Sequence, residues 1–162
     1  MGGKLTNGKK ISAKKAREIV SKVKSVIGNH GVYEAGSLRR GKSEIGDLDL
    51  IVVREEAENN LNERLKDLTG IDLSNRKTCS FLFENVQIDL NICNAEVKGS
   101  YILHWTGSVR ENVRLRKAAK KLGLKLSQNG LVDKNKNNLS KHKTEQDIYG
   151  LLDMKYVIPE NR

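Results

Sequence analysis

The chain has 162 residues, of which 37% are hydrophobic and 31% charged, and its 30 Lys and Arg against 20 Asp and Glu give a formal net charge of +10. This length and composition indicate one compact domain or two small lobes, and they exclude collagen-like and membrane-spanning chains and secreted disulfide scaffolds. Basic residues dominate residues 1–46 and 100–162, and acidic residues dominate 47–99. Two basic flanks indicate a polyanionic partner such as nucleic acid, although lysine faces that only keep a protein soluble have the same composition.

The cysteine content and the N-terminus indicate the environment of the protein. Cys79 and Cys93 have no nearby histidines with which to form a metal site. The N-terminus lacks the apolar stretch of a signal peptide. We therefore expect a reduced, intracellular protein that does not associate with membranes.

The first elements in chain order are a basic helix and two strands. Ser12 is a helix N-cap, and apolar residues follow at helical spacing until Gly28 ends the run. A short strand is expected over 32–35, and the apolar run Leu48–Val53 is typical of a central strand. The pattern over 56–68 predicts another helix.

A hairpin comes next. Strands over 77–83 and 86–92 meet at Glu84-Asn85, which is a turn signal. In this register Cys79 and Cys93 lie on opposite faces, so no disulfide is expected between them. Asp89 shares the face of Cys93.

The rest of the chain predicts three helices and a small hairpin. The helical pattern over 96–122 is interrupted by Thr-Gly-Ser at 106–108, and its second part is strongly basic. A strand pair is expected around 124–126 and 131–132, with Asn129-Gly130 as its turn, and Thr144 caps a last helix. These elements predict an α+β fold with a mixed sheet in the first lobe and a small C-terminal α/β subdomain.

Two carboxylates at the start of the expected central strand are the first candidates for chemistry. Side chains two apart on a strand point to the same side, so Asp47 and Asp49 project together. Like charges this close are unfavourable unless a cation neutralises them, and their hard oxygen atoms suit Mg²⁺. An Asp-x-Asp pair alone is a weak signal, because many such pairs are solvated strand ends.

Two further segments strengthen this hypothesis. Gly36-Ser37 follows a strand and opens a turn whose N–H groups and hydroxyl suit an anion, and Arg40 adds a planar donor for phosphate. Taken alone, this segment is more simply an ordinary turn with exposed arginines. Asp89 lies among apolar residues, where a carboxylate needs a partner, either a metal shared with the first two carboxylates or an arginine.

Five sequence blocks in this order resemble the family X DNA polymerases of the nucleotidyltransferase superfamily. The blocks are Gly-Ser-Leu-Arg-Arg-Gly at 36–41, Gly-Asp-Leu-Asp-Leu at 46–50, Ile-Asp-Leu at 88–90, Trp-Thr-Gly-Ser at 105–108 and the C-terminal block from Glu145 to Arg162. The resemblance covers nearly the whole chain. It implies a catalytic palm over residues 1–105 and a subdomain that contacts nucleotide and DNA over 106–162.

The resemblance also implies a role for each matching residue. Asp47, Asp49 and Asp89 match the catalytic triad, which holds two Mg²⁺ ions (with Mn²⁺ as the alternative), and Asp89 accepts the proton of the primer 3′-hydroxyl. The residues implied to bind nucleotide are Gly36, Ser37, Arg40, Gly46, His104, Trp105, Thr106, Gly107 and Asn112. Arg116 is implied to meet the minor groove of the nascent base pair. The implied partners are a dNTP and gapped or primer–template DNA; we expect a monomer, and a DNA ligase partner is left open.

The sequence departs from the family pattern at several points. Ile45, Gln87 and His104 replace the serine, arginine, and tyrosine or glycine that are more usual there. The N-terminal lyase and helix-hairpin-helix region is not expected in this chain. We expect four lysines to provide part of the DNA contact that this region makes in the family: Lys14, Lys15, Lys22 and Lys120. A solvated helix surface explains Lys14, Lys15 and Lys22 equally well.

Three functions are compatible with these residues. The first is a template-directed DNA polymerase that fills short gaps in DNA repair. The second is a nucleotidyltransferase acting on RNA, a small molecule or a protein, which would not need Arg116 or the C-terminal block. The third is a catalytically silent DNA-binding module, which would not need three clustered carboxylates. The order of all five blocks favours the polymerase.

Overall fold

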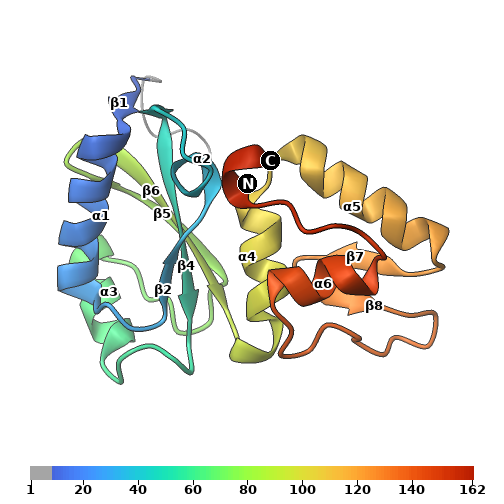
Figure 1. Ribbon diagram of the computed structural model, residues 1–162. Helices are drawn as coiled ribbons and strands as arrows, with labels where there is room; N and C mark the ends of the chain where they lie inside the picture. The colour runs from blue at the N-terminus through green and yellow to red at the C-terminus, as the bar shows by residue number, and fades with distance from the viewer. Residues whose placement is uncertain (1–8) are drawn as a thin grey trace. The chain divides into compact units, whose positions relative to one another are not determined.

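The computed structural model describes residues 9–162, and the described chain forms two compact units, residues 9–93 and Asn94–Arg162. Helices and a mixed sheet confirm the expected α+β class (Figure 1). The compact units separate at a different point from the expected functional subdomains 1–105 and 106–162, which stay a prediction. Within the described residues, no helix is both long and apolar enough to cross a membrane.

A four-stranded sheet forms the centre of the first unit. In spatial order its strands are β2 (Val32–Glu34), β4 (Asp47–Val53), β6 (Val86–Cys93) and β5 (Thr78–Phe83). β4 runs parallel to β6 and antiparallel to β2, while β5 is antiparallel to β6. β4 lies between β2 and β6, which confirms the central strand predicted from its apolar, β-branched run.

Two helices, α1 (Ala13–Ile27) and α3 (Leu61–Thr69), cover one face of this sheet (Figure 1). Ser12 caps α1 as expected, since its hydroxyl accepts a hydrogen bond from the backbone N–H of Lys15. The helix expected from residue 56 begins only at Leu61. The backbone N–H groups of residues 56 and 57 donate to the carbonyl of Val53, so this stretch forms a turn directly after β4.

The hairpin of β5 and β6 has the expected register. Phe81 lies opposite Ile88, and Cys79 lies opposite Leu90. Glu84 and Asn85 at the turn both have positive φ, as a tight hairpin turn requires. Cys79 and Cys93 are both buried, and no disulfide joins them, as the register predicted.

Three short elements complete the first unit. The four-residue helix α2 (Gly36–Arg39) follows β2. The two-residue strands β1 (Ile11–Ser12) and β3 (Glu44–Ile45) pair antiparallel. Strands of two residues carry no periodic pattern, so the sequence did not predict this pair.

The second unit packs helices around a small apolar core. Its elements are η1 (Ala95–Val97), α4 (Lys98–Thr106), α5 (Val109–Lys121), β7 (Lys125–Ser127), β8 (Gly130–Val132), α6 (Glu145–Leu151) and η2 (Pro159–Asn161). The hydroxyl of Ser108 caps α5. Thr144 forms a capping box with Asp147 at the start of α6, which confirms its predicted role as the cap of this helix.

The turn between β7 and β8 differs from the prediction. Ser127 pairs with Gly130, so the turn consists of residues 128–129 and Gly130 already belongs to a strand. A Cβ atom on Gly130 would lie 2.4 Å from the side-chain amide of Asn138. This glycine therefore permits a close approach of Asn138 rather than forming the turn.

Candidate functional site

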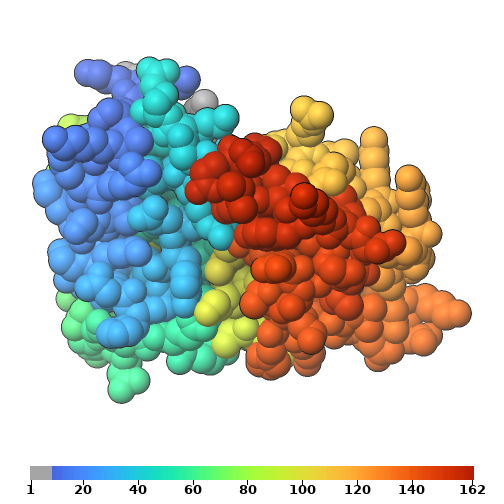
Figure 2. All heavy atoms as spheres, viewed as in Figure 1, coloured from blue at the N-terminus to red at the C-terminus, as the bar shows by residue number. Residues whose placement is uncertain are grey.

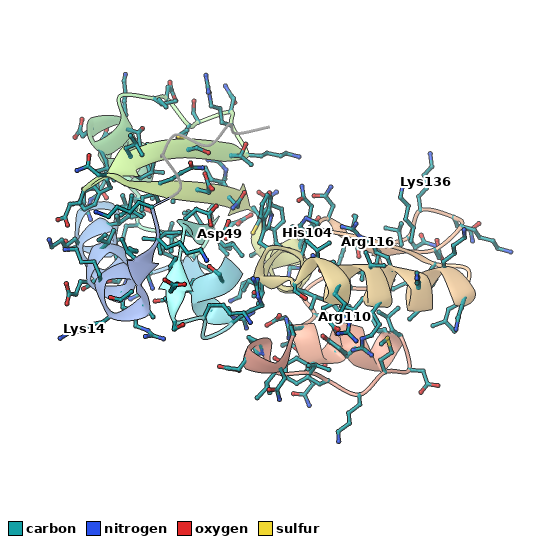
Figure 3. The ribbon with its side chains drawn as sticks, turned by 90° about the horizontal axis from the view of Figure 1, so that it is seen from above. Lys14, Asp49, His104, Arg110, Arg116 and Lys136 are labelled. Atoms are coloured by element: carbon teal, nitrogen blue, oxygen red, sulfur yellow. The ribbon has the colours of Figure 1, made fainter. Side chains whose placement is uncertain are left out.

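The parallel pairing of β4 with β6 brings two of the predicted carboxylates together. The register places Asp49 beside Asp89 and Asp47 beside Gln87. Leu48 on β4 packs into the core under α1 and α3, so by strand alternation these four polar residues face the other side of the sheet. Figure 3 labels Asp49 on its strand. The structure thus assembles the acidic face that the sequence predicted.

Asp49 is the most perturbed acid of this face. Its burial, followed by the charges of Asp47 and Asp89, raises its pKa to about 7, and the nearby Arg40 guanidinium only partly offsets these effects. A half-buried carboxylate among like charges is unstable in its ionised form. The site therefore favours either a proton or a cation at Asp49.

Gly36 is required by the position of Asp49. The backbone N–H of Ala35 donates to the carbonyl of Asp49 at 2.9 Å, which holds the end of β2 against β4. Gly36 then turns with φ +59°, and a Cβ atom there would lie only 1.9 Å from Asp49 Oδ2. Only glycine lets the start of α2 lie this close to the carboxylate.

Asp89 is held by its neighbour on the same face. The side-chain amide of Gln87 donates to both carboxylate oxygen atoms, at 3.0 Å to Oδ1 and 3.1 Å to Oδ2. Gln87 is buried, with 4% of its surface exposed. A neutral amide therefore fixes the Asp89 carboxylate without adding a positive charge. The sequence marked Gln87 only as a departure, and its spacing of two residues from Asp89 on one strand was the signal of this contact.

The donor set can be tested against Mg²⁺ or Mn²⁺. Carboxylate oxygens are the ligands that these ions prefer, and the raised pKa of Asp49 shows that a cation would relieve a repulsion already present. Across residues 9–162, no group of three or more His, Cys, Asp or Glu side chains is placed to hold a metal ion. The residue types fit the ion in their chemistry, and the metal site stays a prediction.

The other predicted phosphate-binding residues surround the acidic face. Ser37 lies in the first turn of α2 and is half-buried, and Arg40 is the C-cap of that helix. Gly46 directly precedes β4, and a Cβ atom there would meet nothing within 4 Å. Space is therefore open beside Gly46, whereas it is closed at Gly36.

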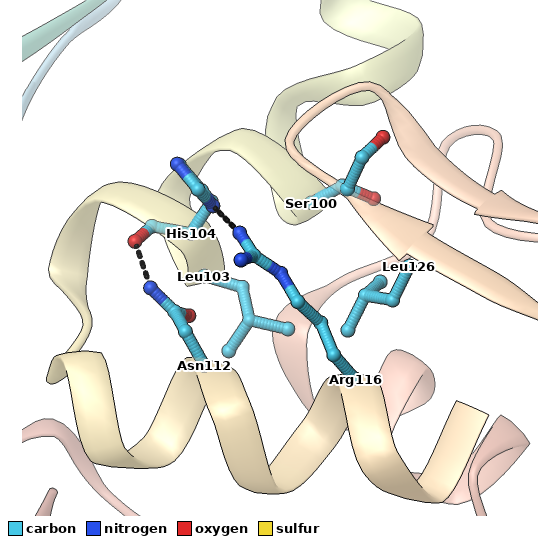
Figure 4. Close-up of a pocket in the computed structure, with 7 residues that line it drawn as sticks. Ser100, Leu103, His104, Asn112, Arg116 and Leu126 are labelled. Atoms are coloured by element: carbon cyan, nitrogen blue, oxygen red, sulfur yellow. Dashed lines mark hydrogen bonds between the residues drawn. The ribbon is translucent and has the colours of Figure 1, made fainter. Parts of the chain in front are cut away.

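In the second unit, three predicted residues line one recess. His104 on α4 and Asn112 and Arg116 on α5 line it together with Ser100, Leu103, Leu126 and Ser127. The Asn112 amide donates to the backbone carbonyl of His104 at 2.8 Å, and Arg116 Nη2 lies 3.1 Å from His104 Nδ1 (Figure 4). Because a guanidinium only donates, Nδ1 accepts and the ring is neutral. Burial, and then the charge of Arg116, lower the pKa of His104 in agreement with this.

Three other predicted residues do not line this recess. Trp105 instead packs edge-on against the His104 ring, with the ring centroids 5.4 Å apart. Thr106 is fully buried, and the N–H of Gly107 donates to the carbonyl of Leu103, which ends α4. These contacts give Thr106 and Gly107 a role in the turn between α4 and α5.

Two of the predicted DNA-binding lysines already have an acidic partner. Glu84, in the hairpin turn, binds Lys15 Nζ at 3.2 Å and also binds Lys22. Hydrogen bonds from Lys22 and then from Lys15 lower the pKa of Glu84. Lys14 points outward from α1 (Figure 3), which lies on the surface of its unit (Figure 2), and Lys120 is exposed on α5. The sequence did not indicate the contacts of Glu84, because they depend on how the hairpin packs beside α1.

Comparisons with known proteins match both units. The family model described as DNA polymerase beta palm matches residues 10–126, and the model described as DNA polymerase beta thumb matches residues 101–162. A protein named Repair DNA polymerase X, from a warthog isolate of African swine fever virus, is 32% identical over 140 residues, which cover 81% of this chain and 80% of that protein. The protein of the same name from a Kenyan pig isolate is 30% identical over an alignment of 171 positions, which covers 98% of each chain. The Bacillus subtilis DNA polymerase/3′-5′ exonuclease PolX is 27% identical over 135 residues, 79% of this chain and 23% of that protein.

The close approach at Gly36 predicts a local sensitivity to substitution. Gly36→Ala combines a positive φ with a clash against Asp49, so we expect it to lower the free energy of unfolding by about 1–3 kcal/mol. Gly46→Ala is the matched control and should change it by less than about 0.5 kcal/mol, because its Cβ meets open space. Urea denaturation measures both values, and equal midpoints for the two variants would contradict this account.

The raised pKa of Asp49 predicts how the metal-free protein responds to pH. The folded state holds this proton more tightly than the unfolded state does, so the stability due to Asp49 falls as pH rises from its ordinary pKa of 3.8 through about 7. Allowing for its partial exposure to water, we expect Asp49→Asn to be on the order of 2 kcal/mol more stable than the parent at pH 8 in chelator, and no more stable at pH 4. Urea midpoints at the two pH values test this. The same pH dependence in both proteins would refute it.

Proposed function

The chain belongs to family X of the DNA polymerases, and we propose that this DNA polymerase fills short gaps in DNA during repair by two-metal nucleotidyl transfer. One observation carries the proposal. Asp49 and Asp89 lie at the same level of two parallel strands, with Asp47 on the same face and Gly36 packed against Asp49. The palm and thumb matches favour this function over transfer to RNA, a small molecule or a protein, and over a silent DNA-binding module.

The proposed reaction extends a primer by one nucleotide. The primer 3′-hydroxyl oxygen bonds to the α-phosphorus of a dNTP, the bond from that phosphorus to the pyrophosphate oxygen breaks, and Asp89 accepts the hydroxyl proton. Gln87 fixes the carboxylate of Asp89 by bonding both of its oxygen atoms, so the acceptor is oriented before substrate arrives. The amide of Gln87 is neutral, so it adds no positive charge beside Asp89.

Asp47, Asp49 and Asp89 are the residues that would hold two Mg²⁺ ions, or Mn²⁺ in their place. When bound, such ions stabilise the charge that develops on the attacking and leaving oxygen atoms. The carboxylates themselves supply the negative charge that attracts the cations. Burial is the main cause of the raised pKa of Asp49, and the charges of Asp47 and Asp89 add to it.

We assign the triphosphate to the start of α2. Backbone N–H groups at Gly36 and Ser37, and the guanidinium of Arg40, are donors that suit phosphate oxygen atoms. Open space at Gly46 leaves room for a bulky anion beside β4. We assign contacts with the incoming sugar and base to His104, Trp105 and Asn112, with Thr106-Gly107 shaping the turn, and contact with the minor groove of the nascent pair to Arg116.

The repair role follows the names of the viral relatives, and it implies gapped or primer–template DNA as the partner. We propose that Lys14, Lys15, Lys22 and Lys120 contact phosphates of that DNA. Binding at Lys15 and Lys22 would require their ion pairs with Glu84 to open. Exposed ion pairs of this kind contribute little stability, so phosphate can replace the carboxylate.

The first experiment is extension of a labelled primer on a duplex with a one-nucleotide gap. We expect Mg²⁺-dependent addition of the templated nucleotide, and Asp89→Asn should slow it by about 10²–10⁴-fold because the proton acceptor is lost. Glu63→Gln on the exposed surface of α3 is the control and should keep the parent rate. If Asp89→Asn extends as fast as the parent, the role of Asp89 is wrong. Untemplated addition, or no addition by a protein that binds the gap, would overturn gap filling.

The contacts of Glu84 predict an unusual gain of function. Glu84→Gln frees Lys22 and leaves Lys15 only its 3.9 Å ion pair with Glu18, so we expect tighter DNA binding and a salt dependence of the affinity that steepens by about one unit for each new phosphate contact. Lys14→Gln should make it shallower by about one unit. Fluorescence anisotropy across a range of salt concentrations measures the slope, with Glu63→Gln as the charge-matched control. An unchanged slope in Glu84→Gln would exclude this face of α1 from the DNA interface.

A further inference from the structure

Three side chains of the C-terminal block are buried inside the second unit. Tyr149 is fully buried on α6, the side chain of Glu145 is only 10% exposed, and that of Arg162 is 0% exposed. Side chains with so little exposed surface do not offer a contact surface to DNA or nucleotide. These three side chains must therefore act through other residues.

Tyr149 connects α6 directly to α5. Its hydroxyl donates a 2.6 Å hydrogen bond to Glu111 Oε1 in the first turn of α5. Arg114, one turn later on α5, donates to both oxygen atoms of the same carboxylate, from Nε to Oε2 at 2.9 Å and from Nη2 to Oε1 at 2.6 Å. A buried carboxylate is thus neutralised by its own helix and bonded to the next one.

Arg162 lies against the Tyr149 ring. Its guanidinium lies 5.6 Å from the ring centroid of Tyr149 and 5.4 Å from that of Tyr156, and its Nη1 donates to Glu145 Oε1 at 2.8 Å. Its Nε also donates to the carbonyl of Val157 at 2.8 Å. The position of the Tyr149 hydroxyl is therefore fixed by packing on its ring.

The other buried side chains of α5 are apolar. Leu115 and Ala119 pack into the core of the second unit, and apolar contacts have no preferred direction along or around a helix. The bond from Tyr149 to Glu111 is directional. It resists rotation and sliding of α5 in a way that the apolar contacts do not.

We propose that Tyr149 and Glu111 are positioning residues that fix α5 so that Asn112 and Arg116 present their side chains correctly to the nucleotide and the nascent base pair. Asn112 directly follows Glu111, and Arg116 lies one turn further along the same helix. Both already converge on His104 in the recess (Figure 4). This inference rests on the nucleotide role proposed above for α5.

The chemistry of the pair suits a permanent link. Hydrogen bonds from Arg114 and Tyr149 keep the pKa of Glu111 below its ordinary value, despite burial, so the acceptor stays ionised. Burial and the bond to Glu111 raise the pKa of the Tyr149 hydroxyl, so the donor keeps its proton. The link is closed at neutral pH.

The test compares two tyrosine variants in single-nucleotide gap filling. In Tyr149→Phe the Glu111 carboxylate keeps Arg114 as its partner, so the variant should fold. We expect its KM for the templated dNTP to rise about three- to tenfold, the effect of one lost hydrogen bond, while the Kd for gapped DNA stays within about twofold. Tyr156→Phe is the matched control, because it keeps the aromatic ring beside Arg162. The hydroxyl that it removes has no hydrogen-bond partner among the described residues. It should retain the parent KM.

A third variant separates this inference from the function on which it rests. Asn112→Ala should raise the KM for dNTP if α5 contacts the nucleotide. If it does so and Tyr149→Phe does not, the positioning role is wrong and the nucleotide role stands. If Asn112→Ala leaves KM unchanged, the nucleotide role of α5 fails and the positioning role fails with it. A Tyr149→Phe variant that only melts earlier, with its KM unchanged, would show a purely structural bond and overturn the proposal.

Discussion

Repulsion among the carboxylates of Asp47, Asp49 and Asp89 is the constraint on which the first unit is built. The sheet places Asp49 and Asp89 side by side, and burial raises the pKa of Asp49 to about 7. The core face of the same strands, which includes Leu48, Leu50, Ile88 and Leu90, is fully buried and supplies the apolar stabilisation that offsets this repulsion. One face of β4 and β6 stabilises the fold so that the other can hold unfavourable charge, as sites that bind cations require.

The sequence predicted most of the sheet and its acidic face, because both follow from strand alternation. The apolar run of β4, the turn at Glu84-Asn85 and the common face of Asp47 and Asp49 are all local patterns. The pairing of Asp49 with Asp89 is not local. The apolar surroundings of Asp89 left a shared metal and an arginine partner both open, and the family resemblance favoured the first. The contacts of Glu84 with α1, and the turn that delays α3 until Leu61, depend on tertiary packing and had no periodic signal.

The two units use buried charge in different ways. In the first unit Asp49 and Asp89 lie side by side, and Arg40 only partly offsets the effects that raise the pKa of Asp49. In the second unit Glu111 is fully satisfied by Arg114 and Tyr149, and Glu145 is paired with Arg162. Satisfied buried ions contribute little net stability but specify one arrangement of the helices. The sequence did not predict the contact of Glu111 with Tyr149, because these residues lie far apart along the chain and only the fold brings them together.

The parallel pairing of β4 and β6 also affects how the protein reaches and leaves its folded state. Parallel neighbours cannot be joined by a tight turn, and here α3 and β5 lie between them in the chain. The hairpin of β5 and β6 and the helices involve nearer residues and can form before this distant closure. The carboxylates then meet only when the last strands join, and their repulsion accelerates opening of the sheet more than it slows its formation. A cation bound between these carboxylates would therefore extend the lifetime of the closed sheet rather than speed its folding.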